Sequence, residues 1–201
     1  MNALIYLLAF TGGFVIMSME LLGGRVLAPY FGSSSHVWGS IITVFMLSLS
    51  LGYLLGGRWS VNQPNLLRYG SIFFFGALLM YPVVFFAEPA MQWIFNAIED
   101  PRYGSLLAST ILFTVPTIIL GMISPYSVRL LVRNVESSGQ VAGRLYFVST
   151  LGSALGTLLT SFYFVLLFEV NSILIMLTLA LISMSIIAVI CHRKGMGAQN
   201  T

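Results

Sequence analysis

Charged residues are rare in this sequence. They make up 7% of its 201 residues, whereas a soluble domain carries about 25%. So few charges cannot cover a surface that faces water, and 58% of the residues are hydrophobic. We therefore expect the lipid bilayer to be the solvent of this chain.

Cysteine, basic runs and catalytic motifs are also scarce or missing. Cys191 is the single cysteine, which excludes intrachain disulfides and cysteine metal clusters. No Lys/Arg-rich stretch with interleaved aromatic residues is present, so the net charge of +3 does not indicate nucleic-acid binding. The sequence has no GxSxG, HExxH or Walker motif, and its two histidines are far apart. We therefore expect no catalysis by this chain, no metal site and no cofactor.

Six apolar stretches approach or reach the length that crosses a bilayer, about 20 residues. They are residues 3–22, 37–56, 71–87, 105–128, 145–168 and 172–191. The first lacks the basic residues that begin a cleavable signal peptide, so we interpret it as a permanent span. The prediction is an all-α polytopic membrane protein with one transmembrane domain over 1–194 and a cytoplasmic tail at 195–201.

The basic residues predict the orientation of the chain. Six spans place both termini on one side of the membrane, and only Arg25 and Arg102 fall on the opposite side. The other basic residues go with the termini: Arg58, Arg68, Arg129, Arg133, Arg144, Arg193 and Lys194. Because basic loops remain cytoplasmic, we expect cytoplasmic termini in a bacterial inner membrane.

The connection Glu88–Gly104 is too polar to cross the bilayer. Five of its residues could form one apolar face of a short helix lying on the outer surface: Met91, Trp93, Ile94, Phe95 and Ile98. A plain loop is the alternative.

Small residues recur at four-residue spacing in two spans. Such rows let helix backbones approach closely in lipid, so they predict that the second and fifth spans are central helices. Sliding of these two spans past each other during transport is the alternative. The rows are Ser48, Gly52 and Gly56 in the second span, and Gly152 and Gly156 in the fifth. In the fourth span, Pro116 and Pro125 are expected to produce kinks.

Glu20 is the acidic residue of the first span, about 17 residues or ~26 Å along it, in the outer third. A charge at the bilayer centre costs roughly 2.5–3.5 kcal/mol on insertion scales, so we expect Glu20 to turn inward or find a partner. Arg25 can pair with it directly only if Gly23–Gly24 end or distort the helix. One hypothesis is that Glu20 binds a cation or carries a proton, while Arg25 regulates it or caps another carboxylate. The alternative is that Glu20 and Arg25 form a structural ion pair.

Three other polar residues are candidates for binding. His36, at the mouth of the second span, either titrates near neutrality or is simply solvated. Tyr146 and Ser149 begin the fifth span beside Arg144, where they form either a gate or an ordinary interfacial anchor.

Two long stretches resemble a known family. ELLGGRVLAPYFGSS followed by VWGSIITVFMLSLSLGYLLGGR is similar to the N-terminal membrane part of the membrane-fused spermidine-synthase-like proteins. GMISPYSVRLL followed by GRLYFVSTLGSALGTLLTSFYFVLLFEV resembles it as well. Ser149 stands where that family usually has Asn. The matching positions are Glu20, Arg25, Leu27, Pro29, Gly32, Gly57, Arg58, Pro125, Gly143, Arg144, Tyr146, Gly152 and Gly156.

The resemblance implies a membrane module without synthase activity. Relatives carry a soluble Rossmann-like aminopropyltransferase domain after the spans, whereas this sequence continues for seven residues after Lys194. The module also resembles half of a major-facilitator transporter, with cytoplasmic termini and a GGR turn after the second span.

Two functions follow as hypotheses. The first is a transporter-like module for a small organic solute, such as a polyamine or another cation, in which Glu20 compensates charge. Half of a major-facilitator fold cannot enclose a pathway alone, so this hypothesis predicts a homodimer or a partner subunit. The alternative is a non-catalytic membrane subunit that assembles a larger complex, for example by docking a separately encoded synthase at Arg129, Arg133 and Arg144.

Overall fold

The structure, a computed structural model, describes residues 2–132 and 134–196. Its helices follow one another along the chain with short connections. They are α1 (Asn2–Phe31), α2 (Ser35–Trp59), α3 (Leu66–Met80), α4 (Val83–Ala97), α5 (Pro101–Gly121), α6 (Ile123–Leu131), α7 (Ser138–Leu159), a π-helix (Thr160–Phe164), α8 (Val165–Leu167), α9 (Val170–Cys191) and a π-helical turn (His192–Met196).

Five helical segments within the described ranges are long and apolar enough to cross a membrane. They are Asn2–Phe31, Ser35–Trp59, Pro101–Leu131, Ser138–Leu167 and Val170–Lys194. A sixth exists if α3 and α4, which meet at a bend of 44°, count as one span. The prediction of an all-α membrane protein is confirmed.

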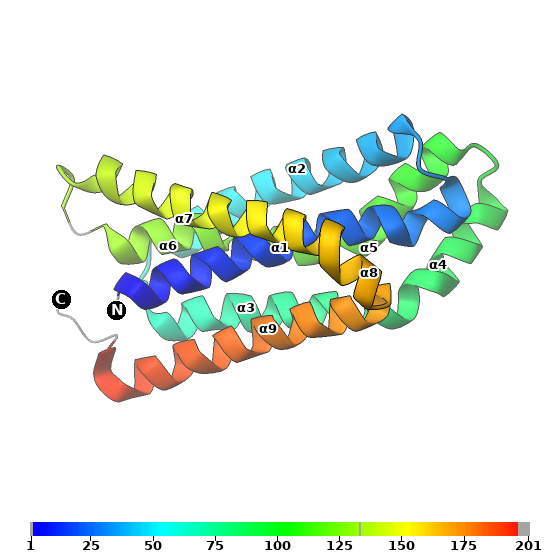
Figure 1. The fold of residues 1–201 in the computed structure, drawn as a ribbon. Helices are drawn as coiled ribbons and strands as arrows, with labels where there is room; N and C mark the ends of the chain where they lie inside the picture. Colours follow the sequence, from blue (N-terminus) through cyan, green and yellow to red (C-terminus); the bar gives the residue numbers. More distant parts are fainter. Residues whose placement is uncertain (1, 133, 197–201) are drawn as a thin grey trace.

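The helices form three layers in an elongated bundle (Figure 1). α1 and α5 make the middle layer, α2 and α7 lie on one side of it, and α3 and α9 lie on the other. The start of α1 and the end of α9 are at the same end of the bundle. The two middle helices therefore have neighbours on both sides, and the other helices do not.

The packing is reciprocal between the two halves of the chain. α1 packs most extensively on α7 and also on α9, while α5 packs most extensively on α2 and also on α3. The outer helices α3 and α9 pack against each other. Each main contact of one half therefore has a counterpart in the other half, with α1 corresponding to α5, α2 to α7 and α3 to α9.

The glycines of the two small-residue rows lie where backbones approach most closely. A Cβ atom at Gly52 would clash with the backbone of α5, and one at Gly56 would lie 2.6 Å from the Cα of Met122. A Cβ atom at Gly152 or Gly156 would clash with the carbonyls of Phe10 and Phe14 in α1. Each row thus brings its helix against one neighbour.

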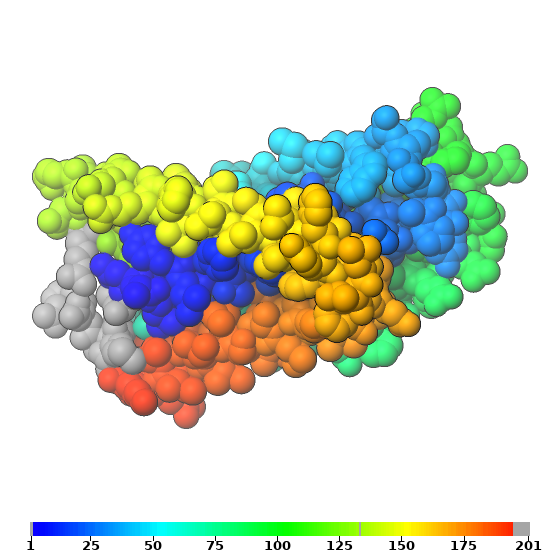
Figure 2. Space-filling view, in the orientation of Figure 1, coloured from blue at the N-terminus to red at the C-terminus, as the bar shows by residue number. Residues whose placement is uncertain are grey.

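The prediction that the second and fifth spans are central is wrong. α7 is the least buried of the five long segments, and Figure 2 shows it along the outside of the molecule, with α1 visible between α7 and α9. The physical reason is that one small-residue row allows one close contact. A central helix needs several, and the glycines of α1 face four helices: Gly12 meets α6, Gly13 meets α7, Gly23 meets α5 and Gly24 meets α2.

One predicted span is bent, and another is interrupted at a single residue within the membrane-long segment Pro101–Leu131. The predicted span 71–87 contains the bend between α3 and α4 at Tyr81 and Pro82, because proline cannot donate the next helical hydrogen bond. The predicted span 105–128 is interrupted at Met122, between α5 and α6. Pro125 lacks the N–H that would bond to the carbonyl of Gly121, whereas Pro116 lies inside α5 without ending it.

The connection between the third and fourth spans contains a helix, but one of its apolar residues, Trp93, does not lie on the face that the others share. α4 covers Val83–Ala97, and Met91 and Ile94 are buried, while Trp93 is 65% exposed and Phe95 is 51% exposed. Trp93 follows Met91 by two residues, about 200° around a helix, so the two point in opposite directions. The prediction of one apolar face is therefore wrong for Trp93, whereas Met91, Ile94 and Phe95 follow the spacing of one face and Phe95 packs against Tyr30 and Phe31.

Candidate functional site

α1 runs without interruption through Gly23, Gly24 and Arg25 to Phe31. The condition for a direct pair between Glu20 and Arg25, a helix that ends or distorts at Gly23–Gly24, is therefore not met, and both glycines instead serve close packing. Gly23 lies against Phe113, and Gly24 lies against the indole of Trp38.

The uninterrupted helix also keeps Glu20 and Arg25 apart. At five residues' separation they lie roughly 140° apart around α1. Among the described residues no ion pair joins them, so the predicted structural ion pair is not formed.

Glu20 faces the space between α2 and α7. It follows Gly13 by seven residues and precedes Gly24 by four, so the three positions share one side of α1. Gly13 lies against Ser149 and Ser153 of α7, and Gly24 lies against α2. α2 and α7 make no extensive contact with each other among the described residues. The Glu20 position is therefore on the α1 surface that these two helices flank.

The Glu20 carboxylate has no partner among the residues that the structure describes. Its side chain is half-buried, and no hydrogen bond or ion pair within residues 2–132 and 134–196 involves it. A carboxylate in a lipid-surrounded site favours a counter-charge or polar contacts. The Glu20 carboxylate could therefore still accept hydrogen bonds from a bound cation or another donor.

A cavity of about 420 Å³, which we call the inner cavity, lies near the end of the bundle that holds the termini. Tyr53 of α2 lines one side, and Tyr146 and Ser149 of α7 line the other. Its remaining lining residues are Ser124, Pro125, Thr150 and Ser153. The structure thus brings the predicted candidates Tyr146 and Ser149 together in a cavity rich in hydroxyl groups.

A second cavity of about 500 Å³, the outer cavity, lies toward the other end of α1. Arg25 and Gly24 of α1, Trp38 of α2 and Thr160 of the π-helix line it. Along α1, Glu20 lies ~10 Å beyond Gly13, which meets the α7 wall of the inner cavity, and ~6 Å before Gly24. Glu20 therefore lies along α1 between the levels of the two cavities, although it lines neither of them.

Ser18 and Thr160 join α1 to the π-helix. The Thr160 hydroxyl donates to the Ser18 hydroxyl at 2.9 Å, and Ser18 donates to the carbonyl of Gly156 at 3.3 Å. Both side chains are fully buried. Single-turn π-helices recur at functional sites, and this one lines the outer cavity. Sequence reasoning missed Ser18, although a serine within an apolar span is itself a signal.

His36 is not near Glu20. It lies in the first turn of α2, where its ring hydrogen-bonds with Ser34 at 2.8 Å. Its neighbour across the end of the bundle is Asp100, whose pKa is lowered chiefly by a hydrogen bond from the backbone N–H of Arg102, with a smaller contribution from His36. His36 lines neither cavity.

The predicted docking arginines are only partly described. Arg129 in α6 and Arg144 in α7 are exposed, and both helices meet the connection at the end of the bundle that holds the termini. Arg133 lies outside the described residues.

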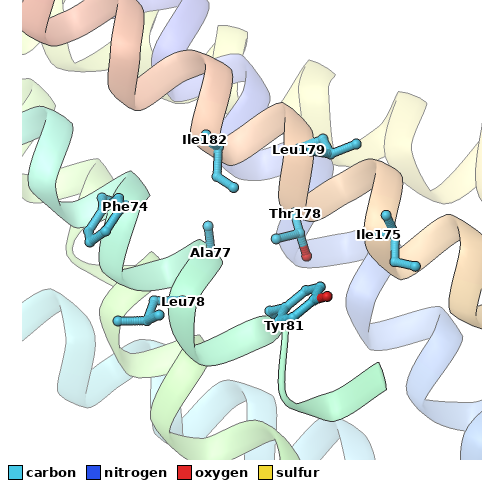
Figure 3. A pocket seen from close by; sticks show the side chains of 8 residues that line it. All are labelled: Phe74, Ala77, Leu78, Tyr81, Ile175, Thr178, Leu179 and Ile182. Atoms are coloured by element: carbon cyan, nitrogen blue, oxygen red, sulfur yellow. The ribbon is translucent and has the colours of Figure 1, made fainter. Parts of the chain in front are cut away.

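A smaller apolar cavity of about 220 Å³ opens between α3 and α9 (Figure 3). Tyr81 and Thr178 carry the hydroxyl groups of its lining, and Thr178 donates to the carbonyl of Leu174 at 2.8 Å. No charged residue lines it. It therefore lacks the groups that would fix a polar solute.

The chain matches no protein-family model, no curated protein and no solved structure.

Proposed function

We propose that this chain is a transporter-like membrane module for a small organic cation, with a polyamine as the leading candidate. The observation that carries the proposal is the position of Glu20: it is half-buried, has no partner among the described residues, and lies on α1 between the levels of two cavities, neither of which it lines. An ammonium group would supply the missing counter-charge. In the inner cavity, the hydroxyls of Tyr53, Tyr146 and Ser149 offer acceptors for further N–H donors.

The reciprocal packing of the two halves supports this proposal. Transporters are often built from inverted repeats, and each half of a major-facilitator transporter contains two repeats of three helices. The exchange of α1 with α5, α2 with α7 and α3 with α9 is the pattern that such repeats produce. We extend the proposal to a six-span, major-facilitator-like half related to the membrane module of spermidine-synthase-like proteins, with cytoplasmic termini.

The proposed transporter needs a second subunit. The inner cavity is lined by Tyr53 of α2 and Tyr146 of α7, and these two helices make no extensive contact with each other in the part of the chain that the structure describes. A two-fold axis along the membrane normal would place α2 of one copy against α7 of the other and close both cavities. We therefore propose a parallel homodimer, with Glu20 of each copy facing the shared space.

Transport is tested in liposomes that contain the purified protein. We expect uptake of labelled spermidine above that of empty vesicles, and at least about a tenfold lower rate for Glu20→Gln, since a hydrogen bond to a charged group is worth about 1.5–3 kcal/mol. Glu99→Gln is the matched control, because Glu99 is an exposed carboxylate in the connection between α4 and α5. Uptake equal to that of empty vesicles, or unchanged uptake by Glu20→Gln, contradicts the proposal.

A second function, a membrane subunit that docks a cytoplasmic synthase, is favoured by the exposed Arg129 and Arg144 at the end of the bundle that holds the termini. Reversing both charges to Glu should then abolish co-purification of the synthase while leaving spermidine uptake unchanged. Unaltered association after charge reversal contradicts this version.

A further inference from the structure

An additional cavity of about 350 Å³ lies where α1, α4 and the start of α9 meet, at the end of the bundle opposite the termini. Arg25 of α1 and Glu88 of α4 both line it, together with Asn171, the second residue of α9. Val84 and Met91 contribute apolar wall. The cavity therefore combines one positive group, one negative group and an apolar surface.

The two charges share the cavity without pairing. No ion pair within 4.0 Å joins Arg25 to Glu88, and neither side chain has a hydrogen-bond partner among the described residues. The first N–H groups of α9 supply further hydrogen-bond donors at this end, beside the carboxylate of the N-cap residue Glu169. A ligand that carries both signs of charge would satisfy both walls at once.

The depth of the cavity matches the headgroup layer of a bilayer. α1 has 30 residues and is therefore ~45 Å long, against ~30 Å for the hydrocarbon core. With α1 centred in the bilayer, Arg25 lies ~13 Å from the midplane, near the edge of the core. The side chain then reaches the level of lipid phosphates.

We propose that this cavity binds a zwitterion composed of a phosphate and a primary ammonium, the headgroup chemistry of phosphatidylethanolamine. Arg25 binds the phosphate, since a guanidinium presents a planar set of donors to phosphate oxygens. Glu88 accepts hydrogen bonds from the ammonium, and Asn171 offers an amide to either group. The site shares Arg25 with the outer cavity, but it does not depend on Glu20, which does not line it.

Native mass spectrometry of the purified full-length protein tests this site with three phospholipids of identical acyl chains. We expect phosphatidylethanolamine to bind more tightly than phosphatidylcholine, whose quaternary ammonium has no N–H to donate, and than phosphatidylglycerol, which has no cation. Glu88→Gln should weaken phosphatidylethanolamine about tenfold or more and leave the other two unchanged. Arg25→Gln should weaken all three lipids.

Glu99→Gln and Arg102→Gln are the matched controls, because both residues are exposed at the same end and neither lines the cavity. Competition by water-soluble phosphoethanolamine would assign the site to a free zwitterion, and its absence would assign the site to intact lipid. Equal binding of the three lipids by the unaltered protein would overturn the proposal. So would unchanged lipid binding in both Arg25→Gln and Glu88→Gln.

Discussion

The Thr160 hydroxyl donates a hydrogen bond of 2.9 Å to the Ser18 hydroxyl across the interface between α1 and α7, with both side chains fully buried. This contact fixes the π-helix against α1 at the point where the chain departs from regular α-helical geometry. Ser18 in turn donates to the Gly156 carbonyl. A polar pair therefore holds the wall of the outer cavity.

Removal of this pair should destabilise the protein modestly. Ser18→Ala leaves the Thr160 hydroxyl without its acceptor, and Thr160→Val removes the donor. Interhelical hydrogen bonds in membrane proteins couple by ~0.6 kcal/mol on average and at most ~1.7 kcal/mol, so we expect the two changes to be less than additive by that amount. Unfolding in mixed detergent micelles measures the free energy of each variant. Strictly additive losses would show that the two hydroxyls do not interact.

Gly152 and Gly143 form a matched pair for testing the close contact of α7 with α1. A methyl group at Gly152 meets the carbonyl of Phe10, so Gly152→Ala should cost about 1–3 kcal/mol through overpacking. Nothing lies within 4 Å of a Cβ atom at Gly143, so Gly143→Ala should be neutral or stabilise by roughly 0.5–1 kcal/mol. Equal effects of the two changes on thermal unfolding would contradict the observed helix packing.

Thiol accessibility can test whether the inner cavity is open to water. In a Cys191→Ser background, Ser153→Cys should react with a small membrane-impermeant maleimide, because Ser153 lines that cavity. Ser109→Cys should remain unmodified, since Ser109 is fully buried in α5. Spermidine should slow the reaction at position 153. Equal labelling of the two positions would rule out a water-filled inner cavity.

Asp100 gives a pH dependence outside the membrane-spanning helices. The hydrogen bond from the Arg102 backbone N–H holds the pKa of Asp100 below the ordinary value of 3.8. A lowered folded-state pKa contributes stability above the unfolded value, and that contribution is lost as the pH falls through the folded value. The protection of the amides at the start of α5 against hydrogen exchange, relative to the intrinsic rate at each pH, should therefore decrease at acidic pH. Asp100→Asn should remove this acid dependence, because a neutral amide still caps the helix but does not titrate.

Some features of the bundle were predictable because they depend on neighbouring residues only. Hydrophobicity over about 20 residues marks a span wherever the span later packs. The break before Pro125 follows in the same way from one missing N–H. Tyr146 and Ser149 could be named as site residues because polar side chains at the start of a span have a local cost.

The surroundings of Glu20 could not be predicted in the same way. Gly23 and Gly24 suggest a helix end when only the chain is considered, yet Phe113 and Trp38 pack into the space that they leave, and α1 continues. Arg25 is consequently turned away from Glu20 and lines a cavity with Glu88 instead. Each of these outcomes depends on residues far away in the sequence.

By itself the sequence determined that this protein is a helical membrane protein, because too few charges are present for a water-facing surface. Only the tertiary structure decided that each row of small residues contacts one neighbouring helix, that α1 and α5 are the central helices, and that Glu20 has no partner among the described residues. The physical reason is that the apolarity of a segment depends on its own residues alone. Whether a helix is central, or whether a charged side chain has a partner, depends on all the segments that pack around it.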